Sequence, residues 1–232
     1  MSATPLPTVS LCATAYRQDG AWDRFIDSAL ATPYEVTITT HTVDLWAVCG
    51  WSPDRSSVSW VPRSTRFVSR GAGRQLAHDA SRGDLVVQLD ADTEYAHLDR
   101  YVARYLAEHD GALLDVGAAS CPGRDMGHAV IGRRDAFRAV GGYRDLFARE
   151  DVDLAQRARR LGLWVAMDGD PADFRRILAP AERASDARRY ERTFARRAGR
   201  EARTLLASVA VMGVRAGALR PIADGLKGRV RG

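Results

Sequence analysis

Two aspartates follow directly on an apolar segment in the stretch LVVQLDADTEY, residues 85–95. The run from Leu85 to Leu89 has the composition of a buried strand, and Asp90 and Asp92 stand at its end. Because an unpaired carboxylate is costly to bury, this pair needs either a partner or water. Carboxylate oxygens are the ligands that a hard divalent cation prefers, so the pair indicates Mg²⁺ or Mn²⁺, with a solvated acidic turn as the alternative.

A second acidic group consists of Glu150, Asp151 and Asp153, at the start of a segment with helical periodicity, 151–162. The positive end of the helix dipole favours ionised carboxylates in a first turn. The group can equally be an ordinary acidic helix start without a chemical role, in which Asp153 pairs with Arg157 at i, i+4.

Alternating strands and helices are expected to position both acidic groups. Strands are predicted at 8–16, 34–43, 56–62, 85–89, 112–120, 127–132 and 163–168. Helices are predicted at 22–30, 71–84, 98–106, 134–143 and 151–162. This alternation predicts an α/β domain with a mostly parallel central sheet flanked by helices. Ligands of such sheets bind outside the carboxyl ends of the strands, where Asp90 and Asp92 are expected to lie.

Composition and cysteine usage limit the class of protein. Of the 232 residues 46% are hydrophobic and 27% are charged, which is typical of a globular chain with a sizeable core. The cysteines Cys12, Cys49 and Cys121 form neither a zinc pattern nor a disulfide framework, and we expect them to be small buried side chains. The start of the sequence lacks a secretory signal, and no apolar stretch is long enough to span a bilayer. We therefore expect a cytoplasmic location, with peripheral contact to the inner face of the membrane left open.

The positive charge is concentrated near the end of the sequence. Residues 175–232 contain 15 Arg or Lys and 5 Asp or Glu, although the net charge of the whole chain is only +5. The Arg-rich stretch 181–215 is predicted to be helical and also carries an apolar segment, Leu205–Val214. It can bind an anionic membrane surface, or it can pack its apolar stripe on the domain. Nucleic-acid binding is the weaker alternative, because charge alone supports it.

Two longer segments resemble a known family. The first, SRGAGRQLAHDASRGDLVVQLDADTEY (69–95), combines a Gly- and Arg-rich helix start, an Ala-rich helix, Gly-Asp, an apolar strand and Asp-x-Asp. The second, GRRDAFRAVGGYRDLFAREDVDLAQRARRLG (132–162), contains Val-Gly-Gly-Tyr and a helix that begins Glu-Asp-x-Asp. In this order and spacing the segments resemble the family 2 glycosyltransferases of the GT-A fold, over roughly residues 8–170.

The resemblance implies a site for a nucleotide-diphosphate sugar. In it Asp92 would hold a divalent cation, Mg²⁺ or Mn²⁺, and Asp90 would lie beside it, as a second ligand and next to the ribose or sugar of the donor. Asp151 would be the general base that accepts the proton of the acceptor hydroxyl, and such a single displacement inverts the anomeric carbon. Arg70 and Arg74 can contact the donor diphosphate or can be solvated surface charges. The implied substrate-binding residues are Thr14, Tyr16, Asp44, Arg70, Arg74, Asp90, Glu150 and Arg157.

The sequence departs from the family pattern at three places. The first strand ends in TAYR (14–17) where the family has Pro-Thr-Tyr-Asn or similar. ITTHTVD (38–44) has Thr40 and His41 where the usual aspartate would fall, and Asp44 can substitute for it. Many members supply a histidine metal ligand after the Glu-Asp helix, but all five histidines here lie at or before His128. Asp168 or Asp170 can stand in for it; otherwise the metal is held more weakly or is not required.

We therefore expect a metal-dependent inverting glycosyltransferase domain, 8–175, followed by a basic helical tail, 176–232. Its expected partners are a nucleotide-diphosphate sugar donor and a glycan or polyprenyl-lipid-linked acceptor. The departures leave an alternative, a catalytically impaired nucleotide-sugar-binding protein that the tail recruits to membranes. Sugar nucleotidyl transfer is disfavoured, because no Gly-rich phosphate loop follows the first strand.

Overall fold

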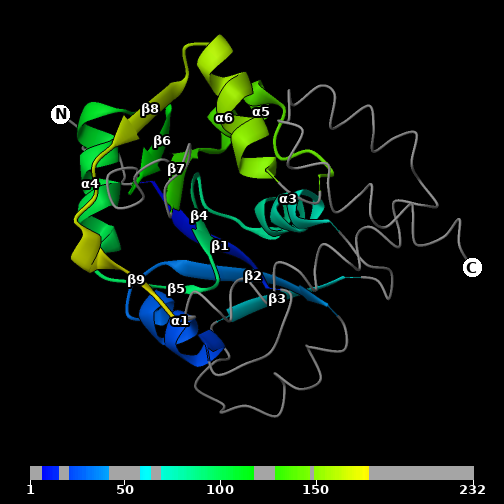
Figure 1. The fold of residues 1–232 in the computed structure, drawn as a ribbon, viewed down its shortest axis with the longest axis vertical. Helices are drawn as coiled ribbons and strands as arrows, with labels where there is room; N and C mark the ends of the chain where they lie inside the picture. The colour runs from blue at the N-terminus through cyan, green and yellow to red at the C-terminus, as the bar shows by residue number, and fades with distance from the viewer. Residues whose placement is uncertain are drawn as a thin grey trace, which may run out of the picture. The chain divides into compact units, whose positions relative to one another are not determined.

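A central sheet of seven strands organises the residues that the computed structural model describes, 7–15, 21–41, 58–63, 69–117, 129–146 and 149–177. The strands are ordered β3-β2-β1-β4-β7-β6-β8 (Figure 1). Their bounds are β1 (Val9–Ala15), β2 (Glu35–His41), β3 (Val58–Arg63), β4 (Leu85–Asp90), β6 (Leu113–Val116), β7 (Ala129–Arg133) and β8 (Trp164–Met167).

The strand directions confirm the predicted fold class. Strand β1 pairs in parallel with β2 and with β4, and β2 pairs in parallel with β3. Strand β6 is parallel to β8, whereas β7 runs antiparallel to both β4 and β6. The sheet is therefore mostly parallel, and the carboxyl end of β4, with Asp90, lies beside that of β1.

A second, two-stranded sheet was not predicted from the sequence. Strand β5 (Thr93–Tyr95) follows the Asp-x-Asp turn and pairs antiparallel with β9 (Phe174–Arg176). Strands of three residues carry too little periodicity to be recognised in a sequence. The register places Thr93 opposite Arg176, so the end of the described chain lies beside the aspartate pair.

The helices form where periodicity predicts them, and they cover both faces of the sheet. They are α1 (Ala21–Leu30), α3 (Arg70–Ala80), α4 (Leu98–Glu108), α5 (Arg134–Val140) and α6 (Glu150–Arg160), with a short 3-10 helix, η3 (Pro171–Asp173). Figure 1 shows α3, α5 and α6 on one side of the sheet and α1 and α4 on the other. Side chains from all three helices of the first group, including Ala77, Phe137 and Leu154, form one buried cluster with Val86 of β4.

The buried cluster also accounts for one of the three cysteines. Cys12 of β1 is fully buried, and its thiol donates to the carbonyl of Ala77 at 3.6 Å. Burial raises the pKa of this thiol to about 12, so it stays protonated and unreactive at neutral pH. The predicted structural role is therefore confirmed for Cys12, whereas Cys49 and Cys121 lie outside the described residues.

The chain divides into two compact units, residues 1–177 and 178–232, and all described residues belong to the first. The predicted Arg-rich helical stretch therefore lies outside the described residues. Within the described part of the chain, no helix is both long enough and apolar enough to cross a membrane.

A glycine in the first turn of α3 lets this helix approach the segment that precedes α6. A Cβ atom at Gly71 would lie 1.8 Å from the carbonyl oxygen of Arg144, which is closer than any real contact. The backbone N–H of Gly71 donates to the carbonyl of Leu146 at 2.9 Å and fastens the two segments together. The missing side chain therefore lets the first turn of α3 pack directly against the backbone of residues 144–146.

We predict that Gly71→Ala destabilises the protein, although helix propensity alone favours alanine by up to about 1 kcal/mol. The new methyl group meets backbone that cannot rotate away, and such overpacking typically costs about 1–3 kcal/mol. Urea unfolding followed by circular dichroism measures the difference. Ala80→Ser, at the exposed end of the same helix, is the matched control and should change the stability little. A Gly71→Ala protein as stable as the wild type would contradict the close contact.

Candidate functional site

A chain of alternating charges joins the two acidic groups that the sequence analysis singled out. Each member contacts the next through an ion pair, and together we call them the charge chain: Arg70, Glu150, Arg74, Asp90, Arg176 and Asp92. The three arginines come from α3 and β9, and the carboxylates come from the end of β4, the turn after it and the start of α6. Segments far apart in the sequence therefore converge on one site.

Arg74 is the central member of the charge chain. Its Nη2 donates to Oδ1 of Asp90 at 2.9 Å, and its Nε lies 3.1 Å from Oε1 of Glu150. The side chain is only 8% exposed and stacks over the ring of Tyr143, 5.6 Å from its centroid. Burial alone lowers the pKa of this guanidinium, but Glu150 and Asp90 raise it well above its ordinary value. The interpretation of Arg74 as a solvated surface charge is wrong, because the side chain is buried between two carboxylates.

Glu150, the first residue of α6, is fully buried beside two arginines. Burial raises its pKa, and the positive charges of Arg70 and Arg74 partly offset that rise. Its carboxylate makes ion pairs at 3.1–3.3 Å but no well-aligned hydrogen bond among the described residues. Arg149, which precedes it, has a φ of 59°, a left-handed conformation that is uncommon for a residue with a side chain. The backbone here adopts a disfavoured turn that starts the helix at the buried carboxylate.

Asp151 differs from its neighbour Glu150 in its surroundings. It is half-buried, and its Oδ1 accepts the backbone N–H of Val152 at 2.8 Å. Among the described residues no ion pair within 4.0 Å involves its carboxylate, yet its negative charge contributes to raising the pKa values of Arg70 and Arg74. The structure therefore brings Asp151 close to the charge chain as a carboxylate in the first turn of α6.

The turn that carries Asp90 and Asp92 is held by a tyrosine. The N–H of Asp90 donates to the hydroxyl of Tyr95 at 2.7 Å, and that hydroxyl donates to the carbonyl of Asp90 at 3.2 Å. Burial raises the pKa of Tyr95 well above its ordinary value, so the hydroxyl keeps its proton. The ring packs edge-on against Phe25 of α1 and Phe174 of β9. The aspartate turn is thereby connected to the apolar core.

Arg176 is the member of the site that sequence reasoning missed. Its Nη1 donates to Oδ2 of Asp90 at 3.3 Å, to Oδ1 of Asp92 at 2.5 Å and to the hydroxyl of Thr93 at 3.1 Å. In the predicted division of the chain Arg176 belongs to the tail. Because arginines are abundant there, nothing in the sequence marked this one as a site residue. Only its pairing with β5 places it beside the aspartates.

The proposed substitutes for the missing histidine ligand do not complete a metal group. Asp168 is exposed, and Asp170 caps η3 by accepting the N–H of Ala172 at 3.0 Å. Across the described residues, no cluster of three or more His, Cys, Asp or Glu side chains is arranged to hold a metal ion. The aspartate pair therefore lacks a third carboxylate or histidine within this part of the chain.

The remaining predicted site residues differ in burial and in their distance from the aspartate pair. Thr14 lies opposite Asp90 in the β1–β4 register, with its hydroxyl buried. Arg70 is 40% exposed and reaches Glu150 at 3.3 Å.

Arg157 pairs with Asp153 at 2.7 Å, which confirms the predicted i, i+4 pair. It also donates to the carbonyls of Val140 and Gly142 and so connects α6 to the end of α5. A substrate contact of Arg157 stays a prediction. Tyr16 and Asp44 lie outside the described residues.

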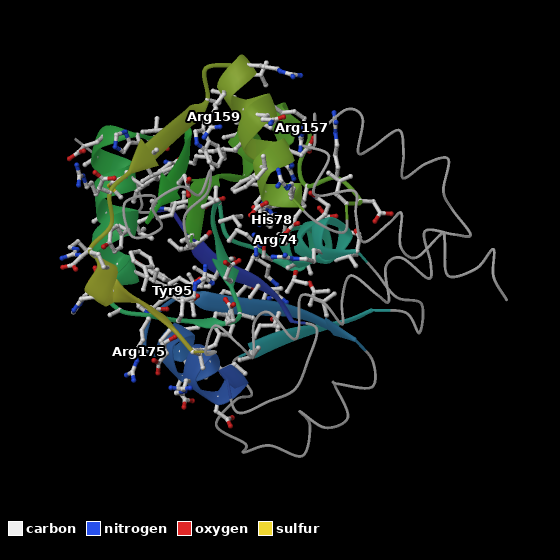
Figure 2. All side chains as sticks on the ribbon, in the orientation of Figure 1. Arg74, His78, Tyr95, Arg157, Arg159 and Arg175 are labelled. Atoms are coloured by element: carbon white, nitrogen blue, oxygen red, sulfur yellow. The ribbon has the colours of Figure 1, made fainter. Side chains whose placement is uncertain are left out.

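A buried histidine, His78, lies one turn after Arg74 on α3. Figure 2 labels both residues, which belong to the same helix. The Nε2 of His78 lies 3.1 Å from Oε1 of Gln88, and the amide of Gln88 donates to the carbonyl of Cys12 at 3.0 Å. The imidazole ring packs edge-on against Phe137 and Tyr143. Burial, together with the charges of Arg134 and Arg74, lowers the pKa of His78 from 6.5 to about 3.

We predict that His78 makes the stability depend on pH. The folded protein keeps the imidazole neutral down to about pH 3, whereas the unfolded chain protonates it near pH 6.5. The unfolded state therefore binds more protons inside this window, and stability is lost as the pH falls through it. In the non-titrating variant His78→Gln this slope should be shallower by up to about 1.4 kcal/mol per pH unit. Urea unfolding between pH 4 and 7 tests this, and equal slopes in both proteins would contradict it.

Comparison with known proteins identifies the fold. No protein-family model matches the sequence, and no curated protein is significantly similar to it. Among solved structures, glucosyl-3-phosphoglycerate synthase from Mycobacterium tuberculosis, in complex with Mn²⁺, uridine diphosphate and phosphoglyceric acid, is 16% identical with a TM-score of 0.54. That match covers 77% of this chain and 74% of the synthase.

Two further solved structures share this fold. A mannosyltransferase from Pyrobaculum calidifontis, in complex with GDP-Man and Mn²⁺, is 13% identical with a TM-score of 0.59, and the match covers 98% of this chain and 76% of that one. TarS from S. aureus is 13% identical with a TM-score of 0.55, and the match covers 81% of this chain and 39% of TarS. At these identities the likeness establishes the fold alone: the chain has the α/β architecture of GT-A glycosyltransferases.

Proposed function

We propose that this protein is a glycosyltransferase that moves a sugar from a nucleotide-diphosphate donor to an acceptor hydroxyl. The observation that carries the proposal is the charge chain. Through one buried arginine, Arg74, it joins Asp90 at the carboxyl end of β4 to Glu150, which directly precedes Asp151 at the start of α6. In open α/β sheets this edge is where ligands bind. The fold shared with a glucosyl-3-phosphoglycerate synthase and a mannosyltransferase supports the same conclusion.

The donor set at the aspartate pair fits a divalent cation. Three side-chain oxygens, from Asp90, Asp92 and Thr93, surround the single nitrogen Nη1 of Arg176, so hard oxygen ligands already converge on one positive charge. Mg²⁺ and Mn²⁺ prefer such ligands and commonly take one or two carboxylates, completing their shell from phosphate oxygens and water. In this proposal Asp90 and Asp92 hold the ion, which when bound neutralises the charge of the leaving diphosphate.

Asp151 is the residue that we assign as general base. It has a carboxylate in the first turn of α6, half-exposed and held by the N–H of Val152, which orients one of its oxygens. Glu150 is unsuited to this role, because it is fully buried and engaged with arginines. In this proposal Arg70 and Arg74 of α3 bind the donor diphosphate. Direct attack by an acceptor hydroxyl deprotonated by Asp151 inverts the anomeric carbon of the transferred sugar.

The acceptor that we propose is a glycan or a polyprenyl-lipid-linked sugar. This part of the proposal rests on the Arg-rich sequence of 181–215, whose basic residues flank an apolar segment suited to an anionic lipid surface. The alternative, a nucleotide-sugar-binding protein without transferase activity, is supported by the lack of a third metal-ligating carboxylate or histidine among the described residues. Activity assays of the variants below separate the two.

We predict that Asp151→Asn abolishes sugar transfer without weakening donor binding. Loss of a general base typically lowers the rate about 10²–10⁴-fold, while the donor contacts of the other residues remain. Transfer is measured as release of the nucleoside diphosphate in the presence of candidate acceptors, and donor binding by calorimetry.

Asp135→Asn is the matched control for this variant. Asp135 also lies in the first turn of a helix, α5, but its side chain is 89% exposed and pairs with Arg138 at the surface. Its rate should equal that of the wild type. Equal turnover in all three proteins at the level of the uncatalysed reaction would favour the binding protein instead.

We also predict that Mn²⁺ and a nucleotide sugar together stabilise the wild type and not Asp92→Asn. A ligand at a hundred times its Kd stabilises the folded state by about 2.7 kcal/mol, which raises the melting temperature by several degrees. A thermal-shift panel of UDP- and GDP-sugars, with and without Mn²⁺, measures this, with Asp135→Asn again as control. An Asp92→Asn protein that keeps the full Mn²⁺-dependent shift would contradict a metal site at the pair.

A further inference from the structure

Arg176 is held beside the aspartate pair by backbone pairing. Its strand, β9, pairs with β5, and the register sets Arg176 opposite Thr93, immediately after Asp92. Successive residues of a strand point to opposite faces, so its neighbour Arg175 points away. The side chain of Arg176 is 21% exposed, whereas that of Arg175 is 75% exposed and lies on the outside of the molecule (Figure 2). Arg176 therefore points inward because of the strand register, and not because arginines are abundant in this part of the sequence.

The guanidinium of Arg176 occupies the centre of the proposed metal ligands. Its Nη1 contacts one oxygen each of Asp90, Asp92 and Thr93. Burial lowers the pKa of this group, but the charges of Asp90 and Asp92 raise it above its ordinary value, so it is permanently charged. A divalent cation on the same oxygens would lie within a few ångströms of this charge, where like charges repel strongly in a partly buried site.

The arginine side chain has an alternative partner when a donor is bound. A guanidinium binds phosphate oxygens through parallel N–H donors, so a diphosphate next to the aspartate turn offers it strong charge-assisted hydrogen bonds. The backbone of β9 stays paired with β5, and rotation of the flexible side chain alone suffices for the exchange. The same charge can thus compensate either the carboxylates or the diphosphate.

We propose that Arg176 is a built-in counter-ion of Asp90 and Asp92, which a divalent cation has to displace and which a nucleoside diphosphate then accepts. The identity of these ligands rests on the proposed function. The consequence is coupling: the guanidinium opposes binding of the cation alone, and the diphosphate removes this opposition. Because coupling free energies are reciprocal, the cation strengthens diphosphate binding by the same factor.

The experiment measures Mn²⁺ binding to the metal-stripped full-length protein by the electron paramagnetic resonance signal of free Mn²⁺. Wild type, Arg176→Ala and Arg175→Ala are compared at constant ionic strength, each alone and with UDP or GDP. Arg176→Ala should bind Mn²⁺ alone at least about tenfold more tightly than wild type, because a positive charge has been removed next to the site. The enhancement of Mn²⁺ binding by nucleotide should be large in wild type and smaller in Arg176→Ala.

Arg175→Ala removes the same charge from the adjacent residue on the outer face, so it controls for the overall change in charge and should behave as wild type. Arg176→Lys keeps a positive charge and should retain weak binding of Mn²⁺ alone. Circular dichroism melts verify folding, and Arg176→Gln, which keeps most of the side-chain length, replaces Arg176→Ala if the latter does not fold.

Two results would overturn the inference. One is an Mn²⁺ affinity of Arg176→Ala that is equal to or below that of wild type and Arg175→Ala. The other is nucleotide enhancement that is absent in wild type or undiminished in Arg176→Ala. Failure of the proposed function is recognised separately, because Asp151→Asn tests sugar transfer and leaves the Mn²⁺ ligands untouched. Tight Mn²⁺ binding by Arg176→Ala without any transfer by wild type would uphold the counter-ion and reject the transferase.

Discussion

The burial of Arg74 is the constraint on which the site depends. A guanidinium removed from water costs several kcal/mol unless carboxylates compensate it, and the same holds for a buried carboxylate. Arg74 and Glu150 are both buried, and each is tolerated only because the other is present, with Asp90 as the second partner. Through Arg74, helix α3 thereby fixes the distance between Asp90 at the end of β4 and Glu150 at the start of α6. Removal of Arg74 takes away one of the two arginines that pair with the buried Glu150.

Several backbone and packing features make this arrangement possible. Gly71 admits the carbonyl of Arg144 into the space that a side chain would fill, and the left-handed Arg149 starts α6 at the buried glutamate. Behind Arg74, the neutral His78 binds Gln88 of the central strand. Tyr95 holds the aspartate turn from the other side. None of these residues takes part in the proposed reaction, yet each restricts the position of a residue that does.

In the proposed function, the charge chain lets a site rich in carboxylates accept an anionic donor. Its carboxylates alternate with arginines, so incoming phosphate meets guanidinium groups as well as acidic oxygens. A bound phosphate then exchanges partners with these ion pairs, so the site does not gain an uncompensated negative charge. This property links the proposed transferase site to the role inferred for Arg176, whose partner changes while the number of paired charges is maintained.

Much of the fold and part of the site could be predicted from the sequence. Apolar runs and helical periodicity are local properties, so they predicted β4, α3 and α6 within a few residues, and the Asp-x-Asp and Glu-Asp segments could be recognised as acidic ends of such elements. Solvent exposure was less predictable: in the sequence Arg74 looks like an exposed arginine such as Arg82, and only packing shows that it is buried. The two-stranded sheet of β5 and β9 was missed because three residues hold no periodicity.

The sequence by itself thus determined the order of the elements, the parallel α/β class and the position of each carboxylate on the chain. The tertiary structure alone decided which charges meet. Residues 74, 90, 150 and 176 belong to separate segments, and their pairing depends on strand register and on the depth to which each side chain is buried. Electrostatic energy depends on distance and on exclusion of water, and both quantities exist only once the chain has folded.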